Sequence, residues 1–267
     1  MSLEQMRKLL LAKNPELAAL AIKSRADTSI YPHWEMAPNA TATLRFLPDR
    51  NTDNPFFWVE RDFIKLFFQG IKGKPEVKHI QVQVPCMEMY DEECPVLQVV
   101  RTWMKDPTLE DMARRYWKKR SYFYQGFVRE SPIRESDAPI NPIRQFIIGP
   151  QIHNLIRNML MHKDLLESPC DYDRGMDFTI KKTDRNGYGN YDQSYWAFKE
   201  SPISAAERDA IESYGLVDLK SRLPQKPNVE DVKIIYEMFE ASIDGELYDS
   251  ERWARYFAPY GWLLEFG

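Results

Sequence analysis

The amino-acid sequence predicts a mainly β protein with helical additions. Several short segments alternate apolar and polar side chains, which is the pattern of a half-buried strand. One segment among them has the three-to-four spacing of an amphipathic helix. Strands and helices do not alternate regularly, and this disfavours a parallel α/β sheet.

The first elements expected are a helix and a set of strands. Residues 3–24 carry leucine and methionine at helical spacing. An alternating strand opens the body at 41–47, and further strands are expected at 56–59 and 79–84. Residues 69–74 lack the spacing of a phosphate-binding P-loop and predict a hairpin turn.

The later elements are more mixed. We expect helices at 96–103, at 150–160 behind Gly149, and at 230–243. The predicted strands are 121–128, 143–148, 176–182 and 195–198, with a turn over 188–191. Short strands with a single helix among them favour an OB-like barrel with helical additions.

Composition restricts the class of protein. The chain has 267 residues, of which 43 % are hydrophobic and 28 % are charged, as in a folded soluble protein. No apolar stretch approaches the ~20 residues of a membrane span, and the first residues lack the layout of a signal peptide. Three cysteines argue against a disulfide framework and favour a reducing, cytosolic setting.

The net charge of −4 is unevenly distributed. Residues 201–267 carry 13 acidic against 7 basic side chains, so the preceding chain is slightly basic. An acidic end on a slightly basic body is compatible with a nucleic-acid-binding core and a partner-facing segment.

The run over 114–124 combines five cations with five aromatic rings. Single-stranded nucleic acid attracts both kinds of side chain, because cations bind phosphates and flat rings stack on unpaired bases. The alternative is a half-buried strand preceded by a basic, solvated turn.

Five stretches, taken in order, resemble the family of T-even-type bacteriophage single-stranded DNA (ssDNA)-binding proteins. Members of this family destabilise the DNA double helix during replication. The stretches are Ala42–Pro48, Cys94–Val96, Lys118–Tyr122, the helix from Gly149 to Ile156, and Gly187–Asp192. The likeness covers roughly residues 40–200. No stretch is diagnostic alone, but their order together is fairly specific.

The resemblance implies an OB-fold barrel that holds the DNA in a basic, aromatic-lined cleft, with a small zinc-ribbon-like subdomain and terminal helices. We accordingly expect an N-terminal helical segment over 1–38 and an ssDNA-binding core over 39–203. The subdomain is expected as an insertion at 60–112, and an acidic, helical and aromatic C-terminal region at 204–267.

The candidate DNA-binding residues combine the basic and aromatic run with positions that match the family motifs. The cations would neutralise phosphates, and the rings would stack on bases without reading their identity. For Tyr188 and Tyr191 the alternative is a tyrosine pair that packs a turn. The full set is Arg114, Arg115, Lys118, Lys119, Arg120, Ser121, Tyr122, Phe123, Tyr124, Phe146, Tyr188 and Tyr191.

Family members commonly hold a structural zinc through one histidine and three cysteines. Here Cys86 and Cys94 match, but Leu97 and Arg61 occupy the other two positions, and neither side chain can ligate zinc. His79 could substitute, giving only three ligands. The favoured expectation is no metal, with the cysteines acting as small apolar side chains.

The sequence shows no catalytic centre, and we expect a protein that is not an enzyme. The aspartates at 171, 173 and 177 suggest a metal loop, but Lys182 stands where an EF-hand requires glutamate. No serine–histidine–aspartate or cysteine–histidine pairing is visible. A metal-dependent nuclease using these carboxylates is kept as an alternative, as is an RNA-binding or transcription-regulating module.

The two ends differ from the family pattern. Arg7 and Lys8 are a weak counterpart of the family's N-terminal cooperativity segment. The C-terminal end carries Trp253, Phe257 and further rings in place of a low-complexity acidic tail. It could dock on phage replication or recombination proteins or on a host polymerase, or fold back on its own core.

The favoured hypothesis is a protein that coats and protects ssDNA, melts hairpins, and acts in phage DNA replication, recombination and repair. Its expected location is the cytoplasm of the infected bacterial host.

Overall fold

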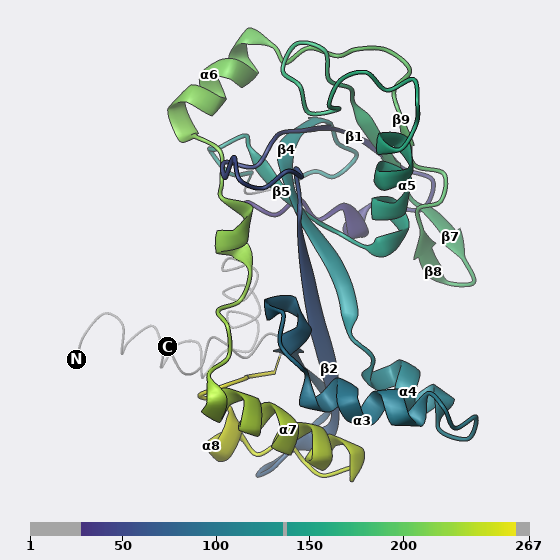
Figure 1. Cartoon of the computed structure of the whole chain (residues 1–267), viewed down its shortest axis with the longest axis vertical. Helices are drawn as coiled ribbons and strands as arrows, with labels where there is room; N and C mark the ends of the chain where they lie inside the picture. The colour runs from purple at the N-terminus through teal and green to yellow at the C-terminus, as the bar shows by residue number, and fades with distance from the viewer. Residues whose placement is uncertain (1–27, 136–137, 260–267) are drawn as a thin grey trace, which may run out of the picture. The chain divides into compact units, whose positions relative to one another are not determined.

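The structure, a computed structural model, describes residues 28–135 and 138–259 (Figure 1). Its contacts divide the chain into two compact units, each built from segments that are distant in the sequence. Of the described residues, unit 1 holds 63–119 and 226–259, and unit 2 holds 28–62 and 120–225. The predicted boundaries differ, because the stretch from 204 to 225, expected in the C-terminal region, lies in unit 2.

Unit 1 is built on a long antiparallel hairpin. Strand β2 (Val59–Ile71), from Phe63 onward, pairs with β3 (Lys74–Pro85), and Gly73 adopts a φ of +80° in the turn, as glycine readily does. The predicted hairpin turn at 69–74 is therefore confirmed. The other elements of unit 1 are η2 (Met87–Tyr90), α3 (Pro95–Trp103), α4 (Glu110–Tyr116), α7 (Val229–Ile243) and α8 (Ser250–Trp253).

The core of unit 1 draws on both chain segments. Alternation along β2 buries Ile64, Leu66 and Phe68 on one face. Helix α7 adds Phe239, and α8 adds Trp253, to the same cluster. The alternative that the aromatic C-terminal end folds back on the protein therefore holds for Trp253, which is 3 % exposed.

Unit 2 contains an antiparallel sheet and a separate two-stranded hairpin. Strand β1 pairs with β4 on one side and with β6 on the other, while β5 pairs with β4 and β9 with β6. The strands are β1 (Thr41–Phe46), β4 (Lys119–Glu130, from Arg120 onward), β5 (Arg144–Ile148), β6 (Phe178–Lys181), β7 (Thr183–Arg185), β8 (Tyr188–Asn190) and β9 (Tyr195–Trp196).

Helices cover this sheet at positions that the sequence explains. Gly149 caps α5 (Pro150–Leu160), proline occupies the first turn, and Ile152 and Ile156 face the core. Ser204 and Glu207 form a capping box at α6 (Ala205–Tyr214). The 3-10 helices of unit 2 are η1 (His33–Glu35) and η3 (Leu219–Arg222).

The prediction of a mainly β fold with helical additions is confirmed, and the sheets are antiparallel. The described strands form open sheets, without closure into a barrel. The strand expected at 56–59 begins only at Val59, because the Asn54 side chain holds the preceding residues in a loop. Helix α4 was not predicted, and the expected turn at 188–191 contains strand β8.

No helix in the described part of the chain is long and apolar enough to cross a bilayer. The predicted helix at 3–24, with Arg7 and Lys8, lies outside the described residues, as do the terminal rings after Pro259.

Candidate nucleic-acid interface

The basic run is divided between the two units at Lys119 and Arg120. On the unit 1 side, Arg114 donates from Nε to Glu110 at 3.0 Å, an i,i+4 pair along α4. Lys118 pairs with Glu88 at 3.0 Å. These two cations already have carboxylate partners, which reduces what they can offer to a phosphate.

Arg115 and Lys119 differ from their neighbours. The Arg115 guanidinium lies 4.3 Å from the ring centroid of Phe67 and remains exposed. Lys119 Nζ donates to the Arg114 carbonyl at 2.8 Å, and burial together with the nearby Lys65 ammonium lowers the pKa of Lys119. Neither cation has a carboxylate within ion-pair distance among the described residues, so both can bind phosphate.

On the unit 2 side, the start of β4 is neutralised. Arg120 donates two hydrogen bonds of 2.9 Å to Asp62 and also pairs with Glu60 at 3.0 Å. The bond to Asp62 raises the pKa of Arg120. Ser121 Oγ accepts from Arg61 Nε at 3.1 Å. Arg120 and Ser121 therefore serve local structure in this conformation.

The aromatic residues that follow are core residues, which corrects the prediction that they stack on bases. Tyr122 lies flat on the His153 ring with centroids 3.4 Å apart, and Tyr124 bonds His153 Nδ1 through its hydroxyl at 2.6 Å. Phe123 packs in a cluster on the other face of β4, and Phe146 is fully buried. Burial raises the pKa of Tyr124. No base can reach these rings while the unit stays folded.

The second aromatic motif has the opposite environment. Strands β7 and β8 pair through Arg185 and Tyr188, and the turn between them is Asn186-Gly187. Both turn residues have positive φ, +56° and +81°, as a type I′ hairpin requires. Tyr188 directly follows this turn and is 79 % exposed. The hairpin therefore projects the Tyr188 ring into solvent.

A cation and a second ring lie against the hairpin. A Cβ added at Gly189 would lie 3.2 Å from the Lys182 side chain and 3.5 Å from the Tyr191 hydroxyl, so glycine allows their close approach. Lys182 Nζ donates to the Trp34 carbonyl at 2.6 Å. Trp34 is 45 % exposed.

His33 and Gln151 position the rings of this region. The His33 ring lies edge-on to Trp34 and Tyr191, with centroids 5.3 and 5.7 Å away. Burial lowers the pKa of His33 to about 4, so this support is neutral near pH 7. Gln151, on the first turn of α5, accepts from the Tyr191 backbone N–H at 2.9 Å.

We call Trp34, Lys182, Arg185, Tyr188 and Tyr191 the hairpin cluster. Its rings are exposed or half-buried, and its two cations have no carboxylate partner among the described residues. Tyr188 lies across from Arg185, and Lys182 and Tyr191 lie at Gly189. Sequence reasoning found the two tyrosines and missed the other three residues. The missed signals were the Asn186-Gly187 turn dipeptide and Lys182, which directly follows Lys181 at the end of β6.

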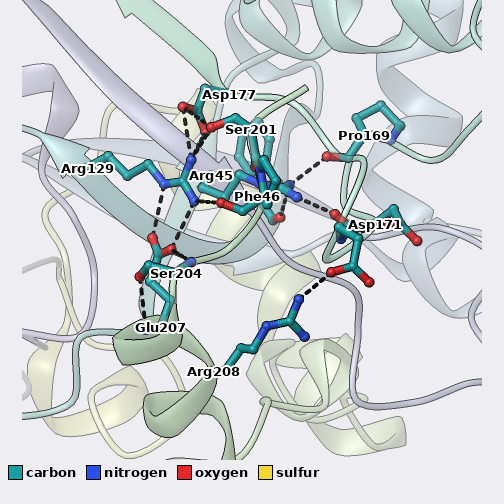
Figure 2. A network of polar contacts seen from close by, with 12 residues as sticks. Arg45, Phe46, Arg129, Pro169, Asp171, Asp177, Ser201, Ser204, Glu207 and Arg208 are labelled. Atoms are coloured by element: carbon teal, nitrogen blue, oxygen red, sulfur yellow. Dashed lines mark hydrogen bonds and ion pairs between the residues drawn. The ribbon is translucent and has the colours of Figure 1, made fainter. Parts of the chain in front are cut away.

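A different polar network explains the aspartates that suggested a metal loop (Figure 2). It begins with Arg45, which is fully buried on β1. Arg45 donates to the backbone carbonyls of Phe46 at 3.1 Å, Pro169 at 2.7 Å and Ser201 at 3.0 Å, and also to that of Asp171. Loops that lie far apart in the sequence are thereby tied to the sheet.

The carboxylates of this network are occupied. Figure 2 shows Asp177 against Arg129, and their N–O distance is 2.9 Å. Asp171 accepts the backbone N–H of Asp173 at 2.9 Å, and Asp173 pairs with Arg208. In the described ranges no group of three histidine, cysteine, aspartate or glutamate side chains is arranged to hold a metal ion.

The three-ligand zinc set of His79, Cys86 and Cys94 is also corrected. His79 is exposed on β3, seven residues before Cys86, and an extended strand of that length spans about 20 Å. Zinc ligands must all lie about 2 Å from the metal. Both cysteines are buried in the unit 1 core, and the hydrogen bond with Cys94, together with burial, raises the pKa of Cys86.

Unit 1 also contains an acidic hollow of about 270 Å³. Arg101 pairs with Glu88 at its wall, and Lys226 pairs with Glu92. The remaining negative charge repels phosphate, so this hollow is not part of the candidate interface. Its lining residues are Glu88, Asp91, Glu92, Glu93, Gln98 and Arg101.

Comparison with models of known protein families finds no match for this chain, and comparison with curated proteins finds none either.

Proposed function

We propose that the protein binds single-stranded DNA without sequence preference, and that the hairpin cluster is its main contact for bases. The observation that carries the proposal is the exposed Tyr188 ring, which lies across from Arg185 on a hairpin whose Gly189 approaches Lys182 and Tyr191. Rings of this kind stack on any unpaired base, and the cation neutralises a neighbouring phosphate. In duplex DNA the bases are already stacked, so the cluster favours unpaired strands.

The proposal extends to unit 1. Arg115 and Lys119 are the members of the basic run that can still neutralise phosphates, while Arg114, Lys118 and Arg120 hold carboxylates. In this proposal the rings of unit 2 stack on bases, and the cations of unit 1 add electrostatic affinity for phosphates.

The resemblance to the phage ssDNA-binding family supports the same function. In this proposal the antiparallel sheet of unit 2 serves as an OB-like core, with loops and a hairpin as the ligand-carrying parts. A protein that prefers unpaired strands shifts duplex towards coil by mass action. With this preference the protein would coat DNA and melt hairpins during replication, recombination and repair. Recruitment of phage replication or recombination proteins, or of a host polymerase, stays a prediction.

The direct test is a titration of the full chain with (dT)12, matched duplex and matched RNA at several salt concentrations. We expect quenching of tryptophan and tyrosine fluorescence with (dT)12, weak binding to duplex, and an affinity that falls as salt rises. Equal affinity for duplex, or absence of binding, contradicts the proposal. Tighter binding to RNA would favour the RNA-binding alternative.

A second measurement addresses the nuclease alternative. Labelled oligonucleotide is incubated with the protein and magnesium or manganese. We expect intact oligonucleotide, because Asp171, Asp173 and Asp177 are engaged in structural contacts. Catalytic cleavage that co-purifies with the folded protein would overturn the assignment as a non-enzymatic binding protein.

A further inference from the structure

The loop between β1 and β2 holds another exposed ring of unit 2. Phe56 is 52 % exposed and lies over Trp58, with ring centroids 4.6 Å apart and planes 29° apart. Its backbone N–H donates to Asn54 Oδ1 at 3.1 Å. Asn54 Nδ2 donates in turn to Asp49 Oδ2 at 2.8 Å and to the Trp58 carbonyl at 3.1 Å. The loop therefore fixes the Phe56 ring before any ligand arrives.

The support behind Phe56 is part of the unit 2 core. Trp58 is 7 % exposed, and its ring lies 5.1 Å from His153 and 5.8 Å from Tyr124. One side of the Phe56 ring thus rests on a packed aromatic layer, while about half of the residue stays in water. An exposed aromatic residue held in this way is a preformed stacking surface.

Helix α5, which packs against Trp58 through His153, also carries an exposed cation. Arg157 follows His153 by four residues on α5, so the two side chains lie on the same face of the helix. The Arg157 guanidinium is close enough to help lower the pKa of His153, after the larger effect of burial. Arg157 is exposed and has no carboxylate partner in the part of the chain that the structure describes. A single strand offers bases to exposed rings and phosphates to cations of this kind.

The first turn of α5 connects this loop with the hairpin cluster. Gln151 accepts from the Tyr191 backbone, and His153 contacts Trp58. The two positions are two residues apart, about 3 Å along the helix axis, and their side chains point to different sides of the helix. Figure 1 shows α5 beside the β7–β8 hairpin. Both stacking surfaces are therefore anchored to one helical turn within the same unit.

We propose that Phe56 and Arg157 form a second ssDNA subsite, in which Phe56 stacks on a base and Arg157 binds a phosphate of the strand that also occupies the hairpin cluster. This inference rests on the proposed function and assigns it two further residues. The strand crosses the start of α5 between the two subsites. Stacking at Phe56 does not depend on base identity, so the added subsite raises affinity without adding sequence preference.

The test measures (dT)12 affinity of full-length variants at several salt concentrations. Phe56→Ala is expected to weaken binding roughly 5- to 150-fold while leaving the salt slope unchanged. Phe56→Tyr keeps the ring and is expected to retain affinity. Arg157→Gln is expected to reduce the steepness of the slope by about 0.7, the value of one phosphate contact.

Matched controls use exposed residues outside the proposed path. Phe198→Ala removes a fully exposed ring, and Lys163→Gln removes an exposed cation just beyond α5. Both are expected to match the wild type. Thermal melting of each variant checks that the fold is intact.

The outcomes separate this inference from the proposed function. If Tyr188→Ala weakens binding while Phe56→Ala and Arg157→Gln do not, the second subsite is refuted and the proposed function stands. If the wild-type protein fails to bind (dT)12, both are refuted. Equal losses for Phe198→Ala and Phe56→Ala would also refute the subsite, because any exposed ring would then suffice.

Discussion

Two tyrosine-bearing stretches, Tyr122–Tyr124 on β4 and Tyr188–Tyr191 at the hairpin, have similar composition and opposite environments. Strand β4 pairs with both β1 and β5, and side chains cover both of its faces. The β7–β8 hairpin is a sheet of two strands, and its Tyr188 ring meets solvent. The number of layers around a strand, and not its aromatic content, decides whether a ring is available to a ligand.

The largest expected effect is on the free energy of unfolding, and it tests whether Tyr124 is buried and Tyr188 is exposed. Tyr124→Ala removes a fully buried ring and leaves His153 Nδ1 without its partner, so we expect a loss of about 3–5 kcal/mol in the free energy of unfolding. Tyr188→Ala is expected to change it by less than about 0.5 kcal/mol. Urea denaturation measures both. A stable Tyr124→Ala variant with weakened DNA binding would mean that Tyr124 faces the ligand after all.

The second prediction concerns pH. Burial lowers the pKa of both His33 and His153 to about 4, so the unfolded chain takes up protons from about pH 6.5 while the folded one does not. Stability should therefore fall as the pH decreases from about 6.5 to 4, by on the order of 3 kcal/mol at most for each histidine. Denaturation at pH 7 and 4.5 measures the loss.

Variants locate this pH effect in unit 2. The double variant with His33→Gln and His153→Gln is expected to flatten the dependence, whereas His162→Gln, at an exposed position, is expected to leave it unchanged. An unchanged dependence in the double variant would contradict the assignment.

The third prediction compares the contributions of the hairpin-cluster rings and of another exposed ring to DNA affinity. Trp34→Ala and Tyr188→Ala should each weaken (dT)12 binding by about 1–3 kcal/mol, because each removes a stacking surface. Tyr214→Ala removes a ring on α6 whose exposure is close to that of Trp34, and it serves as the control. Fluorescence titration gives the affinities. If Tyr214→Ala matched Tyr188→Ala, the hairpin would have no special role.

The fourth prediction separates free cations from paired ones. Lys182→Ala and Arg115→Ala should each reduce the salt slope for single strands by about 0.7. Arg114→Ala should change it less, because Arg114 already holds Glu110. Affinities of the variants for single strands, measured from low to high salt, give these slopes. Equal changes for Arg114 and Arg115 would show that the ion pair opens on binding.

The smallest effect is expected from metal removal. Cys86 and Cys94 are buried in an apolar core and His79 is remote, so treatment with a chelator should leave the melting temperature unchanged. A clear decrease in melting temperature, restored by added zinc, would contradict this prediction.

The sequence predicted elements well where polar and apolar residues alternate, as in β1 and β6, or follow helical spacing, as in α5. It did not predict which aromatic run is exposed. Tyr122, Phe123 and Tyr124 place rings on both faces of a strand, and this pattern is typical of strands covered on both sides. Trp34 and Phe56 were missed because Trp34 lies in a single turn of 3-10 helix and Phe56 lies in a loop, and in neither does exposure follow from periodicity.

The interleaved order of the two units has a consequence for synthesis in the cell. The β2–β3 hairpin leaves the ribosome long before Phe239 and Trp253, the residues that cover its apolar face. Until the last helices emerge, Ile64, Leu66 and Phe68 have no native cover from them, and a chain that terminates early never gains it. Premature termination should therefore yield an aggregation-prone, protease-sensitive fragment instead of a smaller working protein.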